Sequence, residues 1–350
     1  MAQPIRIGIL NDMANAPDPG RDGDPGLWLQ RAVGDLAVAD RIDRPVEFVR
    51  GWGLGLPGGT AAAVERAYAD LAAQDVLMIV GPAIGDNALV ATPLADRHRI
   101  ATLNWAGAER GRSDWMFHLQ VGSHEDESLV IARHLHALGC RRLAVAYDRS
   151  QIGTRHLRYL EDEARILGLR IAGTAGISPL AETAESEVAE LLETRPDGFV
   201  YLGLGLSAPA VARALGGSKW QGPRIMNTAG LRGYHGDFAA VVDGWHYVDM
   251  FSDDNRTLTA LLARHGLDRR QSLAAGKGHD LGRLVAEAIA RAPELTRVGL
   301  RHGLEQVKWL PAAEGFEGTL LGFGIHDRGA LHGRYLVVRQ WLDGETVQAG

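Results

Sequence analysis

The fold is decided by two neighbouring apolar runs, Val76-Leu77-Met78-Ile79-Val80-Gly81-Pro82 and Ile100-Ala101-Thr102-Leu103-Asn104-Trp105-Ala106. The first run ends in Gly-Pro, a helical stretch follows it, and the second run ends in small and polar residues. This order predicts strand, loop, helix, strand, loop. Ligands of open parallel sheets bind at the carboxyl ends of the strands, so we expect both loops to lie at one edge and to face a cleft.

The same alternation of apolar strands and helices continues on both sides of these runs. A first series places strands at 5–10, 46–50, 76–80, 100–104 and 115–121, and a second series places them at 143–147, 170–175, 198–202, 224–228 and 245–248. The tail alternates apolar and polar residues, which predicts antiparallel strands that turn at Asp343-Gly344. Strands that alternate with helices indicate an α/β fold with parallel sheets covered on both faces, and two such series predict two lobes.

Length and composition narrow the class of protein. The chain has 350 residues, about the length of two ordinary domains. A net charge of −6 argues against a nucleic-acid partner or an anionic membrane surface. No apolar window approaches the roughly 18 to 20 residues of a membrane span. A strand is predicted from Ile5, so we expect no signal peptide in the sequence as written, and a processed amino terminus behind an added Met stays an alternative.

One glycine-rich loop matches the sequence motif of dinucleotide-binding sites. Gly53-Leu54-Gly55-Leu56-Pro57-Gly58 fits G-x-G-x-x-G between a strand and a helix. Pro57 removes one N–H from the cradle that a pyrophosphate needs. The loop also follows the second strand instead of the first, and no acidic residue ends a strand about 20 residues further on. We therefore expect a flexible glycine loop and no nucleotide cofactor.

The histidines and the cysteine give no metal-site pattern. His134 and His136 are two residues apart on a helix, and a metal pair on a helix needs a spacing of three or four. His98, His156 and His265 lie in charged helical segments and are predicted to lie at the surface. The single cysteine, Cys140, excludes an intramolecular disulfide and a cysteine-based metal site. We expect no metal.

The sequence also lacks the patterns of a catalytic nucleophile. The loop serines Ser150 and Ser207 do not lie in a G-x-S-x-G elbow. No pair of carboxylates stands out as an acid/base pair. These observations favour a binding module over an enzyme.

Several motifs then occur in a family's characteristic order along the whole chain. They are Arg6-Ile7-Gly8-Ile9-Leu10, Ile79-Val80-Gly81-Pro82, Phe117-His118-Leu119-Gln120, Leu143–Asp148 followed by Ile152-Gly153, Gly278-His279-Asp280 opening a helix, and closing strands within Gly322–Trp341. With them the chain resembles the type I periplasmic solute-binding proteins, specifically the branched-chain amino-acid and amide-binding family of transport receptors.

The resemblance implies two Rossmann-like α/β lobes joined by three crossovers near residues 120, 250 and 325. The first lobe would hold residues 1–120 with 250–324, and the second 121–249 with 325–350. It also implies a non-enzymatic receptor of an ABC importer, located in the periplasm. Such a receptor captures a small molecule in the cleft between the lobes by hinge closure and presents it to a membrane permease.

The departures from the family concern the ligand. Amino-acid-binding members hold the α-ammonium with an acidic residue after the strand that is predicted here at 224–228, and Ala229 occupies that place. A hydroxyl-bearing position for the α-carboxylate corresponds to Ala108, an aromatic position to Ile152, and a tyrosine position falls within 203–206. An unpaired buried ammonium costs several kcal/mol, on the order of a thousandfold in affinity, so a zwitterionic amino acid is not expected. Asp86 could substitute, but its place favours a helix cap.

The expected binding site combines apolar and polar side chains on loops. Apolar contacts are expected from Ile84, Trp105, Ile152, Leu204 and Leu206, and polar contacts from Asn104, Tyr147, Thr228 and His279. Gly85, Asp86, Ala106 and Ala229 complete the expected site. This set suits a small ligand with an aromatic or aliphatic body and few polar groups. Rim packing of Trp105 and a structural role for His279 stay open.

Two other functions remain as alternatives. One is a cytoplasmic ligand sensor that regulates transcription through a protein partner. The other is a nucleotide-dependent oxidoreductase that uses the glycine loop.

Overall fold

The computed structural model describes residues 3–16, 25–38, 41–234 and 236–349. It divides into two compact units. Unit 1 holds residues 1–121 and 253–335, and unit 2 holds 122–252 and 336–350, so the chain passes between them three times. The sequence placed the third division near residue 325. The segment up to Tyr335 belongs to unit 1 because β13 (Leu331–His332) pairs there with β12 (Leu320–Leu321).

Unit 1 is built on a five-stranded parallel sheet. Its strand order is β2 (Val46–Trp52), β1 (Ile5–Asn11), β3 (Met78–Val80), β4 (Ala101–Asn104) and β5 (Met116–His118). All four pairings are parallel. This order places β1 between β2 and β3, as in doubly wound folds that bind ligands at the carboxyl ends of their strands.

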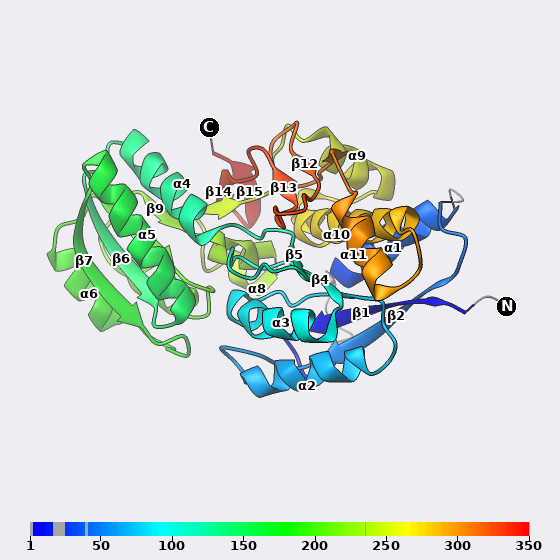
Figure 1. The fold of residues 1–350 in the computed structure, drawn as a ribbon. Coiled ribbons are helices and arrows are strands. Elements are labelled where there is room, and N and C mark those ends of the chain that lie inside the picture. Colours follow the sequence, from blue (N-terminus) through cyan, green and yellow to red (C-terminus); the bar gives the residue numbers. More distant parts are fainter. Residues whose placement is uncertain (1–2, 17–24, 39–40, 235, 350) are drawn as a thin grey trace. The chain divides into compact units, whose positions relative to one another are not determined.

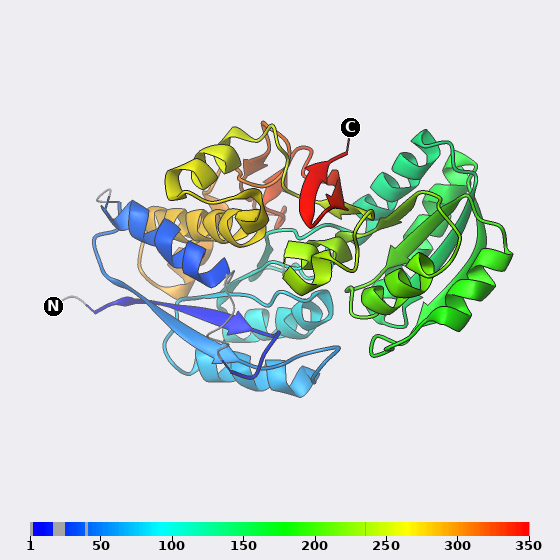
Figure 2. The same ribbon diagram turned by 180° about the vertical axis from the view of Figure 1, so that it is seen from behind.

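Helices cover both faces of this sheet (Figures 1 and 2). One face carries α2 (Ala61–Ala72) and α3 (Gly85–His98), and the other carries α1 (Pro25–Val38), α10 (Ser272–Arg291) and α11 (Arg297–Glu305). The remaining elements of the unit are α9 (Arg256–His265), the 3-10 helix η2 (Arg269–Gln271) and a small antiparallel sheet of β11 (Leu310–Pro311), β12 and β13.

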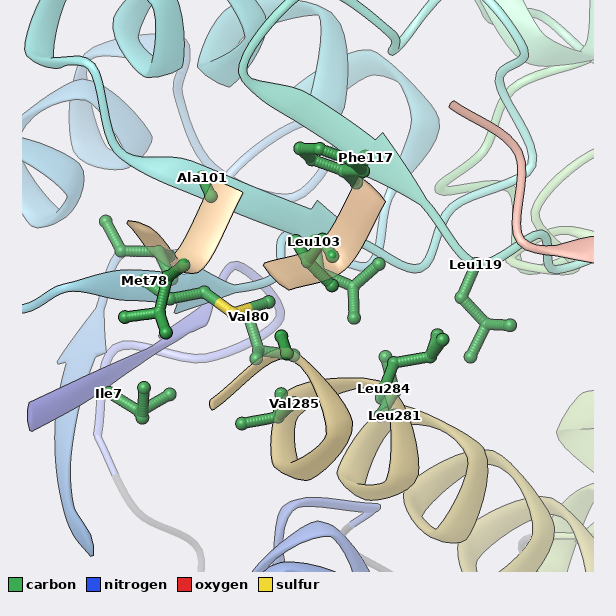
Figure 3. Packing of buried hydrophobic residues seen from close by; sticks show 14 of the residues in the cluster. Ile7, Met78, Val80, Ala101, Leu103, Phe117, Leu119, Leu281, Leu284 and Val285 are labelled. Atoms are coloured by element: carbon green, nitrogen blue, oxygen red, sulfur yellow. The ribbon is translucent and has the colours of Figure 1, made fainter. Parts of the chain in front are cut away.

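The alternation of side chains along β1 explains the two covered faces. Ile7 belongs to the apolar core that also contains Leu284 and Val285 of α10 (Figure 3). The next residue, Gly8, faces Leu71 of α2, and a Cβ placed there would lie 3.5 Å from the methyl carbons of Leu71. Burial of these apolar side chains drives the assembly of the sheet with both helical layers.

Unit 2 has a seven-stranded mixed sheet. Its order is β15 (Glu345–Gln348), β14 (Val337–Leu342), β10 (His246–Asp249), β9 (Arg224–Met226), β8 (Gly198–Leu202), β6 (Arg142–Asp148) and β7 (Arg170–Ile177). The five strands from β10 to β7 are parallel, while β14 and β15 are antiparallel. The predicted turn lies at Asp343-Gly344, where both residues have positive φ, as tight hairpins require.

Two helix pairs cover opposite faces of the sheet in unit 2 (Figures 1 and 2). They are α4 (His124–Ala137) with α5 (Gln151–Leu167), and α6 (Glu185–Glu193) with α7 (Ala208–Gly216). After β9 the chain forms the 3-10 helix η1 (Thr228–Tyr234) and the short α8 (Gly236–Ala239). Both units therefore confirm the predicted α/β fold with parallel sheets. None of the described helices combines the length and apolar character that a membrane span requires.

One predicted helix start is wrong. Gly278 does not open a helix but lies inside α10, which begins at Ser272. Its role is close packing: a Cβ on Gly278 would lie 2.3 Å from the carbonyl oxygen of Pro25, and one on Gly282 would lie 2.6 Å from that of Leu29. The two glycines let the backbones of α10 and α1 approach each other.

A buried ion cluster joins α10 to two loops of unit 1. The Lys277 ammonium lies 2.5 Å from the Glu314 carboxylate and donates to the Gln120 carbonyl at 2.8 Å, and both charged side chains are fully buried. The Asp280 carboxylate accepts from the amides of Ala313 and Glu314 at 2.9–3.1 Å. Burial lowers the pKa of Lys277, and burial together with the Glu314 charge raises the pKa of Asp280 well above its usual range.

The histidine predicted at the surface of α5 is buried instead. The His156 ring lies 4.5 Å from the His124 ring of α4, and its Nε2 lies 3.1 Å from Nδ2 of Asn227. The amide oxygen of Asn227 accepts from the Gly203 N–H, and Nδ2 also donates to the Gly203 carbonyl. Nδ2 therefore donates to His156, whose Nε2 must be unprotonated. Helical spacing did not reveal this because the partner follows 71 residues later.

The buried ion pair should be coupled far more strongly than an exposed one. We expect Lys277→Met to lower the free energy of unfolding by about 3–5 kcal/mol, because it leaves the Glu314 carboxylate buried without its cation. The double variant with Glu314→Gln should lose less than the two single variants together. The control is Arg256→Gln, whose partner Glu317 lies at the surface, with an expected loss of at most about 1 kcal/mol. Equal losses for Lys277→Met and Arg256→Gln in urea unfolding would contradict this.

Acid should destabilise unit 2 through its buried histidines. Burial lowers the pKa of His124 to about 3 and that of His156 well below its usual value. Below a pH of about 6.5 these histidines are protonated in the unfolded chain but not in the folded unit. Their contribution to the free energy of unfolding is therefore fully present above that pH and is lost as the pH falls. The expected slope is about 1.4 kcal/mol per pH unit for each such histidine.

Urea unfolding between pH 7 and pH 4.5 measures this slope. His156→Gln keeps a hydrogen-bond acceptor for Asn227 but removes one titrating group, so its slope should be shallower. His136→Gln, on the exposed side of α4, should keep the slope of the parent protein. Identical slopes for the parent and His156→Gln would show that this histidine does not resist protonation.

Candidate functional site

In unit 1 a buried carboxylate, Asp12, joins the carboxyl ends of two strands, β1 and β3. Asp12 directly follows β1 and accepts from the amides of Ala83 and Ile84 at 2.8 and 3.0 Å and from Nδ2 of Asn87 at 2.8 Å. Burial raises the pKa of the Asp12 carboxyl, while these hydrogen bonds favour its charged form. The loop after β3 and the start of α3, which together carry three of the predicted contacts, are therefore held by the end of β1.

The first predicted contacts lie at the start of α3. Ile84 is the N-cap residue and makes no side-chain capping bond, and Gly85 and Asp86 form the first turn. The expectation that Asp86 caps the helix is therefore wrong, because the capping position is two residues earlier. An acidic residue in the first turn still interacts favourably with the helix dipole.

The loop after β4 carries the next contacts and is tied to the same edge. The Trp105 amide donates to the Pro82 carbonyl at 3.1 Å, which joins the loops after β3 and β4. Asn104 is buried, and its Nδ2 donates to the carbonyls of Gly111 and Phe117 at 2.7 and 2.9 Å. The Ala106 carbonyl lies 2.5 Å from Nε2 of His118. Unit 1 thus brings together the predicted contacts from 84–86 and from 104–106.

The glycine loop supports this edge with its own amides. The N–H groups of Gly53 and Gly55 donate to the carbonyls of Asn11 and Asp12 at 3.0 and 2.9 Å. The Leu56 amide donates to Oδ1 of Asn87 at 2.8 Å, and a Cβ on Gly55 would lie 2.3 Å from the Asn87 amide. A pyrophosphate cradle needs backbone N–H groups that point to the ligand. Here they hold the loop against β1 and α3.

In unit 2 a second buried carboxylate, Asp148, lies at a position equivalent to that of Asp12 in unit 1. Asp148 ends β6, and its Oδ1 accepts from the hydroxyls of Tyr201 and Ser207 at 2.7 and 2.5 Å. Its Oδ2 accepts from the Leu204 amide at 2.9 Å. A Cβ on Gly203 would lie 2.3 Å from this carboxylate, so the glycine is needed for the close approach. Asp148 therefore fixes the loop after β8.

The loop after β9 is held by an amide and a further carboxylate. Asn227 joins the loop to Gly203 through both of its amide groups. The buried Glu127 of α4 accepts from the Thr228 amide at 2.7 Å and from the Ser123 amide at 2.9 Å. The first residues of η1 therefore stand at a fixed place beside the loop after β8.

Leu204, Leu206, Thr228 and Ala229 lie on these connected loops, while Tyr147 lies in β6 and Ile152 in the first turn of α5. Ile152 and Ala229 are buried, and the half-buried ones are Tyr147, Leu204, Leu206 and Thr228. Tyr147 lies beside Gly176 of β7, where a Cβ would meet its hydroxyl at 3.1 Å. The unit thus presents mainly apolar and neutral groups at the carboxyl ends of its strands.

The structure places His279 in different surroundings. Burial lowers its pKa to about 4, and the charged groups that face it are Arg283 of α10, Asp35 of α1, and Arg264 and His265 of α9. These are outer helices of unit 1 and not strand-end loops. The contacts of His279 therefore favour the structural role that the sequence left open.

Sequence reasoning missed the residues that position these loops. Asp12, Asn87, Asp148, Asn227 and Glu127 are buried polar side chains whose partners are 24 to 101 residues away along the chain, except for contacts within one loop. A local signal existed for two of them, since an aspartate at the end of an apolar strand run marks Asp12 and Asp148.

Comparisons with known proteins agree with this architecture. Residues 43–340 match the family model described as periplasmic binding protein. A type 1 periplasmic binding protein from Bordetella pertussis Tohama I has a similar structure, with a TM-score of 0.82 and 14% identity over 99% of this chain and 100% of that chain. An ABC transporter substrate-binding protein from Desulfitobacterium hafniense in complex with Leu has a TM-score of 0.79 and 17% identity over the same shares.

A third solved structure adds the same fold from another organism. An extracellular ligand-binding receptor from Rhodopseudomonas palustris HaA2 has a TM-score of 0.75 and 14% identity over 99% of this chain and 100% of that chain. No curated protein matches the sequence. The family match over most of the chain, together with two α/β units joined by three crossovers, confirms the resemblance: the chain belongs to the periplasmic binding protein family and has its type I fold.

Proposed function

We propose that this chain is the non-enzymatic solute receptor of an ABC importer, that it acts in the periplasm, and that its solute is a small aromatic or aliphatic molecule and not a zwitterionic amino acid. The family match supports the receptor over the alternative of a cytoplasmic sensor. Capture by hinge closure and delivery to a membrane permease follow from the same family membership.

The end of β9 is the observation that carries the proposal. Family members that bind amino acids are expected to have an acidic side chain there, and this chain has the buried methyl group of Ala229. The two buried carboxylates that hold these loops, Asp148 and Glu127, are directed into hydrogen bonds with loop amides and hydroxyls. An α-ammonium would lose its hydration without gaining a countercharge, which costs several kcal/mol.

The apolar character of the loops supports the second half of the proposal. Ile84 and Trp105 in unit 1 and Leu204 and Leu206 in unit 2 are half-buried side chains at strand ends. Solute sites are typically lined by apolar side chains with a few polar groups that set the orientation. The desolvation of these side chains would supply affinity for an apolar body.

The choice of solute is tested by thermal unfolding in the presence of candidate compounds. Leucine and valine at millimolar concentration should leave the unfolding temperature unchanged. At least one aromatic acid or short acyl compound should raise it, because a ligand at 100 times its Kd stabilises the folded protein by about 2.7 kcal/mol. A large shift with leucine or valine would overturn the proposed loss of amino-acid recognition.

The loops of unit 2 should depend on the charge of Asp148. Asp148→Asn leaves one acceptor oxygen for three donors and brings an NH₂ group against one of them, so we expect a loss of about 1–3 kcal/mol in unfolding free energy. The best compound from the thermal screen should also bind at least about tenfold more weakly in calorimetry. The control is Asp162→Asn, on the exposed side of α5, where Arg165 is the partner. Unchanged affinity in Asp148→Asn would show that this loop does not contribute to the site.

A further inference from the structure

One cationic side chain, Arg232, lies on the loops after β8 and β9 of unit 2. Residues 203–207 and 227–234 form the loops after β8 and β9, and Arg232 is the only Asp, Glu, Lys or Arg in either of them. It lies in η1, three residues after Ala229, and its side chain is exposed. The predicted contacts Leu204, Leu206, Thr228 and Ala229 come from the same two loops, so a solute held by them would lie close to this charge.

A glycine in the neighbouring loop makes room for the arginine. A Cβ on Gly205 would lie 2.7 Å from Cδ of Arg232 and 3.2 Å from Cβ of Ala229. Gly205 also has a φ of +80°, which side chains rarely adopt. The aliphatic part of Arg232 thus crosses the backbone of the loop after β8, in the space that a side chain at 205 would fill. The resemblance places the tyrosine position of amino-acid receptors within this loop.

The guanidinium of Arg232 also contacts an aromatic ring of the neighbouring helix. It lies over the ring of Phe238 in α8, with its carbon 5.6 Å from the ring centre. Burial and the Asp148 charge raise the pKa of Tyr201, and Arg232 acts in the opposite direction on that phenol. Tyr201 and Asp148 are hydrogen-bonded to each other at the end of the sheet. The positive charge therefore acts at the carboxyl ends of the strands.

The signs of the charges at this edge are the reverse of what an ammonium group needs. The buried carboxylates Asp148 and Glu127 accept hydrogen bonds from backbone amides and hydroxyls of the loops. The charge that the two loops present at the surface is the guanidinium of Arg232. A planar guanidinium binds a carboxylate through two parallel N–H···O bonds, and such charge-assisted bonds are about twice as strong as neutral ones.

We propose that the solute is a carboxylate without an adjacent ammonium group, and that Arg232 binds its carboxylate while the apolar loop residues hold its body. This inference rests on the proposed function and adds the polar group of the solute and the residue that recognises it. It also accounts for an arginine near the place where amino-acid receptors have an acid: the charge that the site selects has changed sign.

Matched compounds test the charge of the solute. The first series is leucine, 4-methylpentanoate and 4-methylpentanamide, which share one carbon skeleton, and the second is phenylalanine, 3-phenylpropanoate and 3-phenylpropanamide. Calorimetry on the full chain should detect binding of one or both carboxylates, with the corresponding amide and amino acid at least about tenfold weaker. Amides that bind as well as the carboxylates would overturn the inference and leave the proposed function standing. Amino acids that bind best would overturn the proposed function, and a panel without any binding would count against both.

Variants test the residue. Arg232→Gln should weaken the carboxylate between about tenfold and a hundredfold while leaving the amide unchanged, because one charge-assisted contact is lost. Arg232→Lys should recover part of the affinity through its charge. The control is Arg170→Gln, an exposed arginine at the amino end of β7, which should bind like the parent protein. Full carboxylate affinity in Arg232→Gln, with an unfolding temperature equal to that of the parent, would overturn the assignment.

Discussion

Two buried carboxylates hold the loops on which the proposed function of this chain depends. Asp12 follows the first strand of unit 1, and Asp148 ends the first strand of the parallel set in unit 2. In its sheet β1 lies between β2 and β3, and β6 lies between β7 and β8. Each carboxylate accepts a backbone N–H from the loop after one of these neighbours, at Ile84 after β3 and at Leu204 after β8. In both units, therefore, a buried aspartate at the end of a central strand holds a neighbouring loop through backbone hydrogen bonds.

The physical constraint is the cost of burying charge. A buried carboxylate without hydrogen-bond donors costs several kcal/mol, so each loop must keep the conformation that supplies them. Glycines serve this requirement where a Cβ would collide with the network, as at Gly203 beside Asp148 and at Gly55 beside Asn87. Once backbone and glycines fix the loops, the remaining side chains at their tips are free to set what is bound. In the loops after β8 and β9 those side chains are mostly apolar, and the charged one is Arg232.

The fold was largely predictable from the sequence, because the side-chain period and the succession of strands and helices along the chain are local properties. The runs 76–82 and 100–106 gave β3 and β4 and the loops that follow them, and the tail gave the hairpin at Asp343-Gly344. The candidate contacts at 84–86, 104–106 and 204–206 also lie on strand-end loops. The prediction failed where residues act over long distances: Gly278 packs against α1 instead of opening a helix, and His156 is buried between α4 and Asn227.

The sequence by itself determined the α/β class, the parallel sheets, the family and the absence of an acid at Ala229. Each of these depends on a local pattern of residues or on the identity of one residue. Only the tertiary structure decided which polar groups hold the loops and where the charges face. Asp12 accepts a hydrogen bond from the Ala83 amide, Asp148 accepts one from the Leu204 amide, and the side chain of Arg232 packs against Gly205. These partners are 27 to 71 residues apart, and no period or spacing in a chain predicts which distant donors a buried carboxylate will find when the strands assemble.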